Sequence, residues 1–338
     1  MKKKILAIIL AAAMLLTLAA CASTAAPSEN QDTPAETPAS GETAEGKTYV
    51  VGICQLAQHV ALDAATQGFK DALVEELGDA VTFEEQNASG DIPTCSTICT
   101  GFAASNVDLI LANATPALQA AVSATQTIPI LGTAVTEYGV ALDIESFNGT
   151  VGGNVSGTSD LAPLDQQAQM LLDLVPDAKT VGILYCSAEP NSVYQSDVVK
   201  QYLENAGLTV NVYTFADSND VSAVTATACA ECDALYIPTD NTAAFCTEAI
   251  NNVAEPAGIP IVAGEEGICK GCGIATLSIS YYDLGVTTGK MAAKILTGEA
   301  DISEMPIEYF QDPVKKYDAE RCAALGIEIP SDYVAIEG

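Results

Sequence analysis

Two loops, each following a predicted buried strand, carry the side chains best suited to bind a small polar molecule. Residues 181–185 form a short apolar run, and residues 187–192 behind it supply hydroxyl, amide and carboxylate groups. Residues 49–54 form a similar run, which is followed by Gln55 and His59. A continuous apolar run of this length is typical of a strand covered on both faces. The repeated layout predicts two similar lobes whose loops face each other across a ligand.

The same loops could hold the carboxylate of an amino acid. Carboxylates bind at helix N-termini, where unpaired N–H groups and the helix dipole converge. Thr115 is expected to begin one such helix, with Pro116 at its first position, and Asn191–Ser192 to begin another. Simple helix capping is an alternative role for Thr115 and Ser192, and the sequence leaves it open.

The ammonium group of an amino acid needs a carboxylate partner that is partly removed from water. Asp240 is the first candidate because it follows a predicted buried strand at residues 232–238, although it too could be a helix cap. Glu265 is the second candidate. Glu189 is the third, and we expect it to be solvated.

Further polar and aromatic residues at strand ends complete the predicted site. The only histidine, His59, is expected to line the ligand or cap a helix, and one histidine excludes most His-pair metal sites. Tyr138, Tyr281 and Tyr282 are candidate aromatic walls. The predicted ligand-binding residues are Gln55, His59, Thr115, Thr136, Ser187, Asn191, Ser192, Asp240, Asn241, Glu265 and Tyr281. We expect no catalytic residue, metal or cofactor, because no nucleophile elbow, phosphate loop or Ser/His/Asp set is present.

Strands alternate with helices along the chain. This alternation predicts parallel sheets with right-handed crossovers, and ligands of such sheets bind beyond the carboxyl ends of the strands. The predicted strands are 49–54, 81–85, 107–112, 128–133, 181–185, 209–215, 232–238, 259–264, 274–279 and 306–310. The predicted helices are 59–77, 92–105, one beginning at 115, 192–205, 219–229, 281–296 and 319–325.

The N-terminus has the pattern of a bacterial lipoprotein signal. Lys2, Lys3 and Lys4 precede an apolar run, and Leu18-Ala-Ala-Cys21 resembles a lipobox. The resemblance implies cleavage before Cys21 and lipidation of this residue, which would anchor the protein to the outer face of the cell membrane. An ordinary signal peptide with a chance cysteine is the alternative. Residues 22–47 hold only small and polar residues, so we expect a disordered tether.

Length and composition fit an acidic α/β protein. The chain has 338 residues, 49% hydrophobic and 6% aromatic, with a net charge of −31. Two domains of ordinary size fit this length. A core of Ala, Val, Ile and Leu favours α/β structure, and the negative charge argues against nucleic-acid binding. The absence of Trp weighs mildly against a sugar ligand.

Taken together, these segments resemble the tryptophan/tyrosine-type substrate-binding lipoproteins of bacterial ABC importers. The resemblance covers nearly all of residues 48–330. It rests on Gln55-Leu-Ala-Gln-His59 with Leu62-Asp63, Ala114-Thr-Pro-Ala117, Gly149-Thr-Val-Gly-Gly-Asn154, residues 176–185, Glu189-Pro-Asn-Ser192, Pro238-Thr-Asp-Asn241 and Tyr281-Tyr-Asp-Leu-Gly285. The chain departs from the family pattern at Ser280, where Asp is usual, and in its many cysteines.

The resemblance implies a type I periplasmic-binding fold, with two lobes joined by three crossovers that close on a ligand. The lobes would comprise residues 48–159 with 279–302, and residues 160–278 with 303–338. It also implies partnership with an ABC permease and an ATPase, and we expect a monomer. The expected ligand is an amino acid, aromatic ones included. A sugar, a nucleoside, a peptide-like ligand or a sensory role with a membrane receptor are the alternatives.

The ten cysteines that follow Cys21 allow three interpretations. Cys229–Cys232 and Cys269–Cys272 have CxxC spacing, which suits a disulfide or a metal site. Small buried residues in a protein from a reducing environment are the interpretation we favour. The sequence alone does not decide among them.

Overall fold

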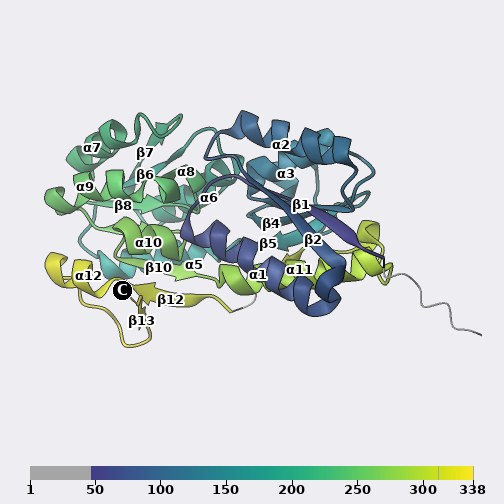
Figure 1. The fold of residues 1–338 in the computed structure, drawn as a ribbon. Helices are drawn as coiled ribbons and strands as arrows, with labels where there is room; N and C mark the ends of the chain where they lie inside the picture. Colours follow the sequence, from purple (N-terminus) through teal and green to yellow (C-terminus); the bar gives the residue numbers. More distant parts are fainter. Residues whose placement is uncertain (1–46, 311, 338) are drawn as a thin grey trace, which may run out of the picture. The chain divides into compact units, whose positions relative to one another are not determined.

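The computed structural model describes residues 47–310 and 312–337. All elements below belong to one compact unit that spans Gly46–Gly338. The lipobox cysteine and the tether up to residue 46 lie outside the described residues. Figure 1 shows the order of helices and strands along this unit.

The first of two sheets is parallel and contains the first predicted strands. Its order is β11 (Glu308–Tyr309), β5 (Val155–Ser159), β4 (Ile130–Val135), β3 (Leu109–Asn113), β1 (Tyr49–Gln55) and β2 (Val81–Asn87). The helices packed with it are α1 (Val60–Leu77), α2 (Ile92–Ser105), α3 (Thr115–Ala124), α4 (Tyr138–Ala141) and α11 (Tyr281–Thr297). We call these strands and helices the first-sheet half.

The second sheet is parallel except at β12, which runs antiparallel to β10. Its order is β13 (Val334–Ala335), β12 (Val314–Tyr317), β10 (Ala275–Ser278), β9 (Ile261–Ala263), β8 (Ala234–Ile237), β6 (Thr180–Cys186) and β7 (Thr209–Phe215). Its helices are α5 (Leu164–Leu174), α6 (Pro190–Asn205), α7 (Val221–Glu231), α8 (Asn241–Phe245), α9 (Thr247–Ala257), α10 (Glu266–Cys272) and α12 (Ala319–Leu325). These elements form the second-sheet half.

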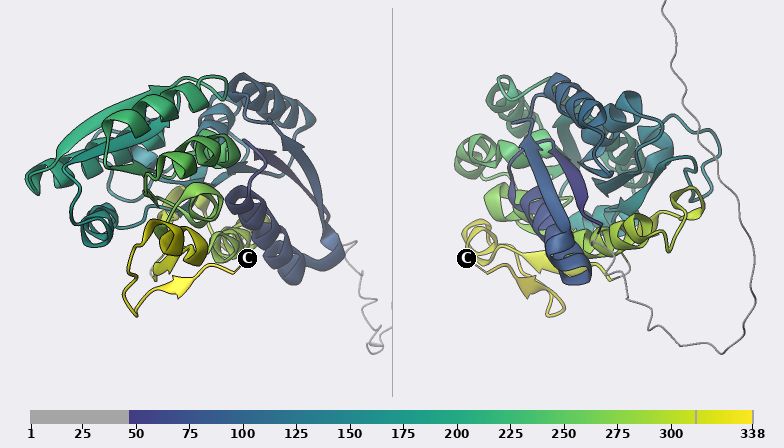
Figure 2. Two further views of the ribbon diagram at one scale, coloured as in Figure 1. Left: turned by 90° about the vertical axis from the view of Figure 1, so that its left-hand side faces the viewer. Right: turned by 45° about the vertical axis from the view of Figure 1, so that its right-hand side comes forward.

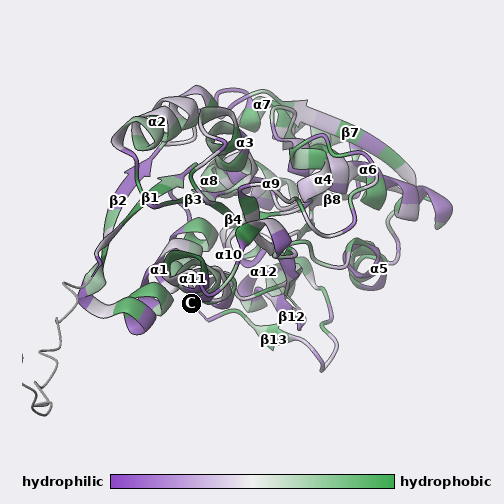
Figure 3. Cartoon of the chain, turned by 90° about the vertical axis from the view of Figure 1, so that its right-hand side faces the viewer, coloured by the Kyte–Doolittle hydropathy of each residue, from purple (hydrophilic) through white to green (hydrophobic). Residues whose placement is uncertain are grey.

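The predicted α/β architecture is confirmed, and its core follows from the strand sequences. Along β1, Val51 and Ile53 pack under α1 and α11, whereas Cys54 faces α2 and α3. Both faces of each sheet are covered in this way, which explains the continuous apolar runs. The edge strand β7 instead alternates between hydrophobic and hydrophilic residues along its length (Figure 3).

Several elements were missed by the sequence prediction, and one was assigned to the wrong sheet. The missed elements are β5, β12, β13, α4, α5, α8, α9 and α10. Strand β5 reads Val-Ser-Gly-Thr-Ser, which lacks an apolar run, and helix α5 was not predicted either. The lobe boundaries place residues 303–338 with the second sheet, but β11 pairs with β5 in the first. A strand of two exposed residues carries no sequence signal for its partner.

Helices α1 and α11 pack closely because glycines lie where they meet. A Cβ placed on Gly285 would lie 2.0 Å from the carbonyl oxygen of Ala65, and one on Gly68 would lie 2.1 Å from that of Tyr282. The two helices run side by side in both views of Figure 2. Their N-termini are thereby fixed next to each other, which places His59 and Tyr281 at one end of the pair.

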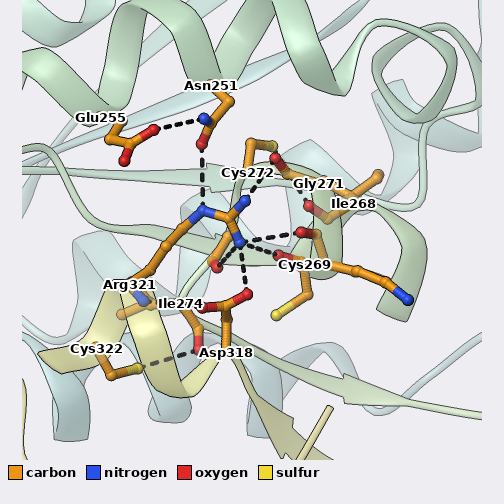
Figure 4. A network of polar contacts seen from close by, with 12 residues as sticks. Asn251, Glu255, Ile268, Cys269, Gly271, Cys272, Ile274, Asp318, Arg321 and Cys322 are labelled. Atoms are coloured by element: carbon orange, nitrogen blue, oxygen red, sulfur yellow. Dashed lines mark hydrogen bonds and ion pairs between the residues drawn. The ribbon is translucent and has the colours of Figure 1, made fainter. Parts of the chain in front are cut away.

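The only arginine of the sequence, Arg321, ties α12 to the end of α10 (Figure 4). Its guanidinium donates to the carbonyl oxygens of Lys270 at 3.0 Å and Gly271 at 2.8 Å, and to the Asp318 carboxylate at 2.7 Å. A cation at a helix C-terminus satisfies the last carbonyl groups and opposes the negative end of the dipole. This contact holds the C-terminal end of α10, whose N-cap at the other end is Glu265.

Membrane-spanning helices, metal-binding groups and disulfides are all absent from the described residues. Within residues 47–310 and 312–337, no helix combines the length and apolar character that a membrane span requires. In the same residues, no group of three or more histidine, cysteine or acidic side chains is placed to hold a metal ion. The ten cysteines of the described part are free thiols, and nine of them are buried.

Candidate functional site

His59 links the two halves of the protein. It precedes α1 in the first-sheet half, and its Nε2 lies 3.3 Å from Oδ1 of Asn241, the first residue of α8 in the second-sheet half. Burial lowers the pKa of the imidazole below its ordinary value. The ring is therefore neutral near pH 7 and has one N–H group and one lone pair.

Glu189 is buried, so the expectation that it is solvated is wrong. Its Oε2 accepts hydrogen bonds from the Asn241 backbone N–H at 3.0 Å and side-chain Nδ2 at 2.6 Å. Its Oε1 accepts from the backbone N–H and the hydroxyl of Thr242, at 2.9 and 2.8 Å. The carboxylate thus satisfies the N-terminus of α8, a role that was not visible in the sequence because α8 follows about 50 residues later.

Asp240 also serves the protein backbone. It accepts from the N–H groups of Ala243 and Cys186, both at 2.7 Å, and it is the N-cap of α8. Burial and the neighbouring Glu189 charge raise its pKa to about 8. The capping alternative left open by the sequence is therefore the role seen in the structure, although Asp240 still lines the cavity described below.

Glu265 has a similar arrangement at α10. Its carboxylate accepts from the N–H groups of Gly267, at 2.6 Å, and Ile268. Burial raises its pKa to about 7. The first two candidate ammonium partners, Asp240 and Glu265, are therefore helix caps, with their oxygens already engaged.

Asp160 is a buried carboxylate that the sequence prediction missed. It follows β5 directly, and its Oδ2 accepts a hydrogen bond of 2.9 Å from the Tyr281 hydroxyl. Burial raises the pKa of Asp160 above its usual range, and the neighbouring hydroxyls of Thr136 and Tyr281 work in the opposite direction. The signal that could have found Asp160 was its place after a strand, and that strand was itself not recognised.

These side chains surround a polar cavity between the two halves. Its volume is about 10 Å³, which is far smaller than an amino acid, so the halves must separate to admit one. The lining residues are His59, Leu62, Ala134, Thr136, Asp160, Asn191, Thr239, Asp240, Asn241, Ala244, Glu265 and Tyr281. No lysine or arginine is among them.

Three buried atoms of lining residues have no hydrogen-bond partner in the described chain. They are Nδ1 of His59, Oδ1 of Asp160 and Oδ1 of Asn191. A buried polar atom without a partner costs about 1–3 kcal/mol, so such atoms call for an explanation. All three sit in one cavity without a cationic side chain, and this points to a ligand that donates hydrogen bonds.

The structure brings together seven of the eleven predicted ligand-binding residues. His59, Thr136, Asn191, Asp240, Asn241, Glu265 and Tyr281 line the cavity. Gln55, Thr115, Ser187 and Ser192 do not line it. Gln55 instead bonds to the Asp63 carboxylate at 2.6 Å and to the Thr66 hydroxyl at 2.7 Å, which fixes the turn into α1.

The remaining three have other surroundings. Thr115 is buried at the first position of α3, whose N-cap is Ala114, so it does not itself cap that helix as the sequence suggested. Ser187 is exposed and bonds to the Phe215 carbonyl at 3.2 Å. Ser192 is buried and bonds to Asp240.

Of the three tyrosines predicted as aromatic walls, only Tyr281 lines the cavity. Tyr138 is fully buried, with its hydroxyl 3.1 Å from the carbonyl of Thr158, and it does not reach the cavity. Tyr281 lines the cavity, whereas Tyr282 is 42% exposed and bonds to Asp71. One of the two adjacent tyrosines therefore points inward, as expected for neighbouring helix positions.

Two mainly parallel sheets joined by crossovers, with a polar cavity between their carboxyl ends, define a type I periplasmic-binding fold. Comparison of the sequence with protein families agrees with this class. Residues 50–334 match the ABC transporter substrate binding protein family, and the chain belongs to this family. The family and its relatives are binding proteins and not enzymes.

Individual relatives cover most of the chain. It is 34% identical over 305 residues to a tyrosine-binding protein of Clostridioides difficile strain R20291, covering 86% of this chain and 87% of that protein. A Streptococcus pneumoniae structure in complex with L-Trp is 32% identical with a TM-score of 0.81, covering 84% of this chain and 97% of that one. A ligand-free, open structure of a Clostridium difficile substrate binding protein with adhesive properties is 37% identical with a TM-score of 0.64, covering 86% and 100%.

Proposed function

We propose that this protein captures an amino acid for an ABC importer, with an aromatic amino acid as the first candidate. The observation that carries the proposal is the carboxylate of Asp160. It is 4% exposed, its Oδ1 has no partner in the described chain, and no cationic side chain lines the cavity that it faces. An ammonium group of the ligand would complete this site, because buried carboxylates are stable only when paired or hydrogen-bonded.

The relatives support the ligand class. One is described as a tyrosine-binding protein, and another was solved with L-Trp. This chain has a higher TM-score to the L-Trp complex than to the open, ligand-free structure, although it is less identical in sequence to the former. The greater structural similarity to the ligand-bound structure supports a closed arrangement of the halves in this protein. The contact between His59 and Asn241 supports it as well.

Capture would occur by closure of two lobes about a hinge. We propose that the lobes correspond to the two sheet halves, with β11 included in the first. The chain passes between the sheets after β5, after β10 and after β11, and these passages would serve as the hinge. The cavity lies between the carboxyl ends of both sheets, so opening would separate its walls.

The setting of the protein is the second part of the proposal. Cys21 would be lipidated and hold the protein at the outer face of the cell membrane, with residues 22–47 as a tether. Permease and ATPase subunits would receive the captured ligand. Family membership supports the transporter context, and the lipobox pattern supports the anchor.

The first test is a ligand screen by thermal shift, followed by calorimetry. A ligand that binds only the folded state raises the melting temperature, so at least one aromatic amino acid should stabilise the protein. Asp160→Asn should then weaken its binding by about tenfold or more, because a charged hydrogen bond is worth about 1.5–3 kcal/mol. Asp143→Asn is the matched control, since Asp143 lies outside the cavity and Asn tolerates its positive φ of 53°.

Two outcomes would contradict the proposal. If sugars or nucleosides stabilise the protein and no amino acid does, the ligand class is wrong. If an amino acid binds equally well to the wild type and to Asp160→Asn, the ligand class stands but Asp160 is not the ammonium partner.

A further inference from the structure

The hydrogen bonds around His59 determine which of its nitrogens carries the proton. Asn241 donates through Nδ2 to Glu189 Oε2 at 2.6 Å, which leaves its Oδ1 to face His59. An amide oxygen only accepts, so His59 Nε2 must carry the hydrogen in their contact. In a neutral imidazole the other nitrogen is then an acceptor, and this is the buried, unpaired Nδ1.

The same reasoning defines Asn191. Its Nδ2 donates to the carbonyl of Thr239 at 3.0 Å and to Glu189 Oε2 at 3.3 Å. These contacts fix the orientation of the amide and turn its Oδ1 into an acceptor without a partner. Asn191 is 4% exposed, and this oxygen has no contact with bulk solvent.

All three unpaired atoms of the cavity are therefore acceptors. Asp160 contributes a carboxylate oxygen, His59 a nitrogen lone pair and Asn191 an amide oxygen. A primary ammonium group has three N–H donors and a positive charge. The three N–H donors of an ammonium group match the three acceptors of the protein, and its positive charge is complementary to the Asp160 carboxylate.

We propose that these three acceptors form the recognition site for a primary ammonium group, and that the protein selects primary amines against N-methylated ones. This inference rests on the proposed function and adds to it the chemical state of the amine. Replacing one N–H by a methyl group keeps the positive charge but removes a donor. One buried acceptor then stays unpaired, which costs binding free energy.

The acceptors come from both halves of the protein. His59 and Asp160 follow strands β1 and β5 of the first sheet, while Asn191 lies on α6 in the second-sheet half. An ammonium group bonded to all three would join the halves directly. The amine would then stabilise the closed arrangement.

Calorimetry with two matched ligand series tests this inference. The first series is L-tryptophan, N-methyl-L-tryptophan and 3-indolepropionate, and the second is the corresponding tyrosine set with 3-(4-hydroxyphenyl)propionate. We expect the better-bound parent to lose at least tenfold in affinity on N-methylation. The deaminated analogue, which keeps the ring and carboxylate, should show no binding.

A variant separates lost hydrogen bonding from a steric clash of the methyl group. In His59→Phe the ring is kept but the Nδ1 acceptor is absent, so the penalty for N-methylation should shrink by at least threefold. If N-methylation weakens binding to this variant as much as binding to the wild type, His59 is not an acceptor for the amine. A wild-type loss below tenfold would overturn the selection for primary amines, while the amino-acid function would stand. If neither parent binds, the proposed function itself fails.

Discussion

At the scale of single residues, the fate of a buried carboxylate depends on which donors surround it. Asp240 and Glu265 accept backbone N–H groups at helix N-termini and have become structural. Asp160 accepts from Tyr281 through one oxygen and keeps the other unpaired. The three residues look alike in the sequence, since each follows a strand. Only the positions of their neighbours distinguish a helix cap from a ligand-binding group.

The buried acids also predict how stability depends on pH. Folding raises the pKa of Asp240 to about 8 and that of Glu265 to about 7. Between about pH 6.5 and 7.5 the folded protein therefore binds more protons than the unfolded chain, in which both acids are ionised. Stability must fall as pH rises through this window, by at most about 1.4 kcal/mol per pH unit for each group.

Urea unfolding at about pH 6.5, 7.0 and 7.5, without added amino acid, measures this slope. Below about pH 6.5 the lowered pKa of His59 contributes a rise in stability with pH instead, because the unfolded chain then binds the extra proton at this residue. The measurement therefore starts at about pH 6.5. Glu265→Gln should reduce the slope, whereas Glu299→Gln at an exposed position should leave it unchanged. A free energy of unfolding that stays constant or rises with pH would show that these acids are not protonated in the folded state.

At the scale of secondary-structure elements, the site depends on the close packing of α1 and α11. Gly285→Ala would place a Cβ atom 2.0 Å from the backbone oxygen of Ala65, so the helices must move apart. We expect a loss of about 1–3 kcal/mol or more in the free energy of unfolding. Gly101→Ala is the control, because a Cβ at this position would have no atom within 4 Å, and it should stabilise α2 by roughly 0.5–1 kcal/mol.

Chemical denaturation of both variants checks this prediction. Because α1 and α11 begin next to His59 and at Tyr281, Gly285→Ala should also weaken amino-acid binding. Equal stability of the two variants would mean that the helices adjust without cost.

The elements themselves were predictable to different degrees. Strands such as β1 and β6 are buried on both faces and are visible in the sequence as apolar runs. Strand β5 packs through Ser156, Gly157 and Thr158, small residues that allow a close approach to β4 but give no hydrophobic signal. The helix from Ile92 to Ser105 was predicted with its observed bounds from the helical spacing of Ile98 and Phe102, and the structure shows Asp91 as its N-cap.

At the scale of the whole folded unit, the cavity belongs to neither half alone. Strand ends from both sheets supply its walls, as the rule for open parallel sheets predicts from sequence. Predicted strand-end residues such as His59, Asp240 and Tyr281 therefore line the same cavity. Which atoms remain unpaired is decided by contacts between distant segments, such as Glu189 with Asn241. No local pattern of residues reveals such contacts.

The central claim is that the cavity binds the primary amine of an amino acid through three acceptors. A crystal structure of the protein with a bound aromatic amino acid tests it most directly. The account predicts the ligand nitrogen at hydrogen-bond distance, about 2.7–3.2 Å, from His59 Nδ1, Asp160 Oδ1 and Asn191 Oδ1. A ligand carboxylate or ring in that position, or an amine bound elsewhere, would contradict it.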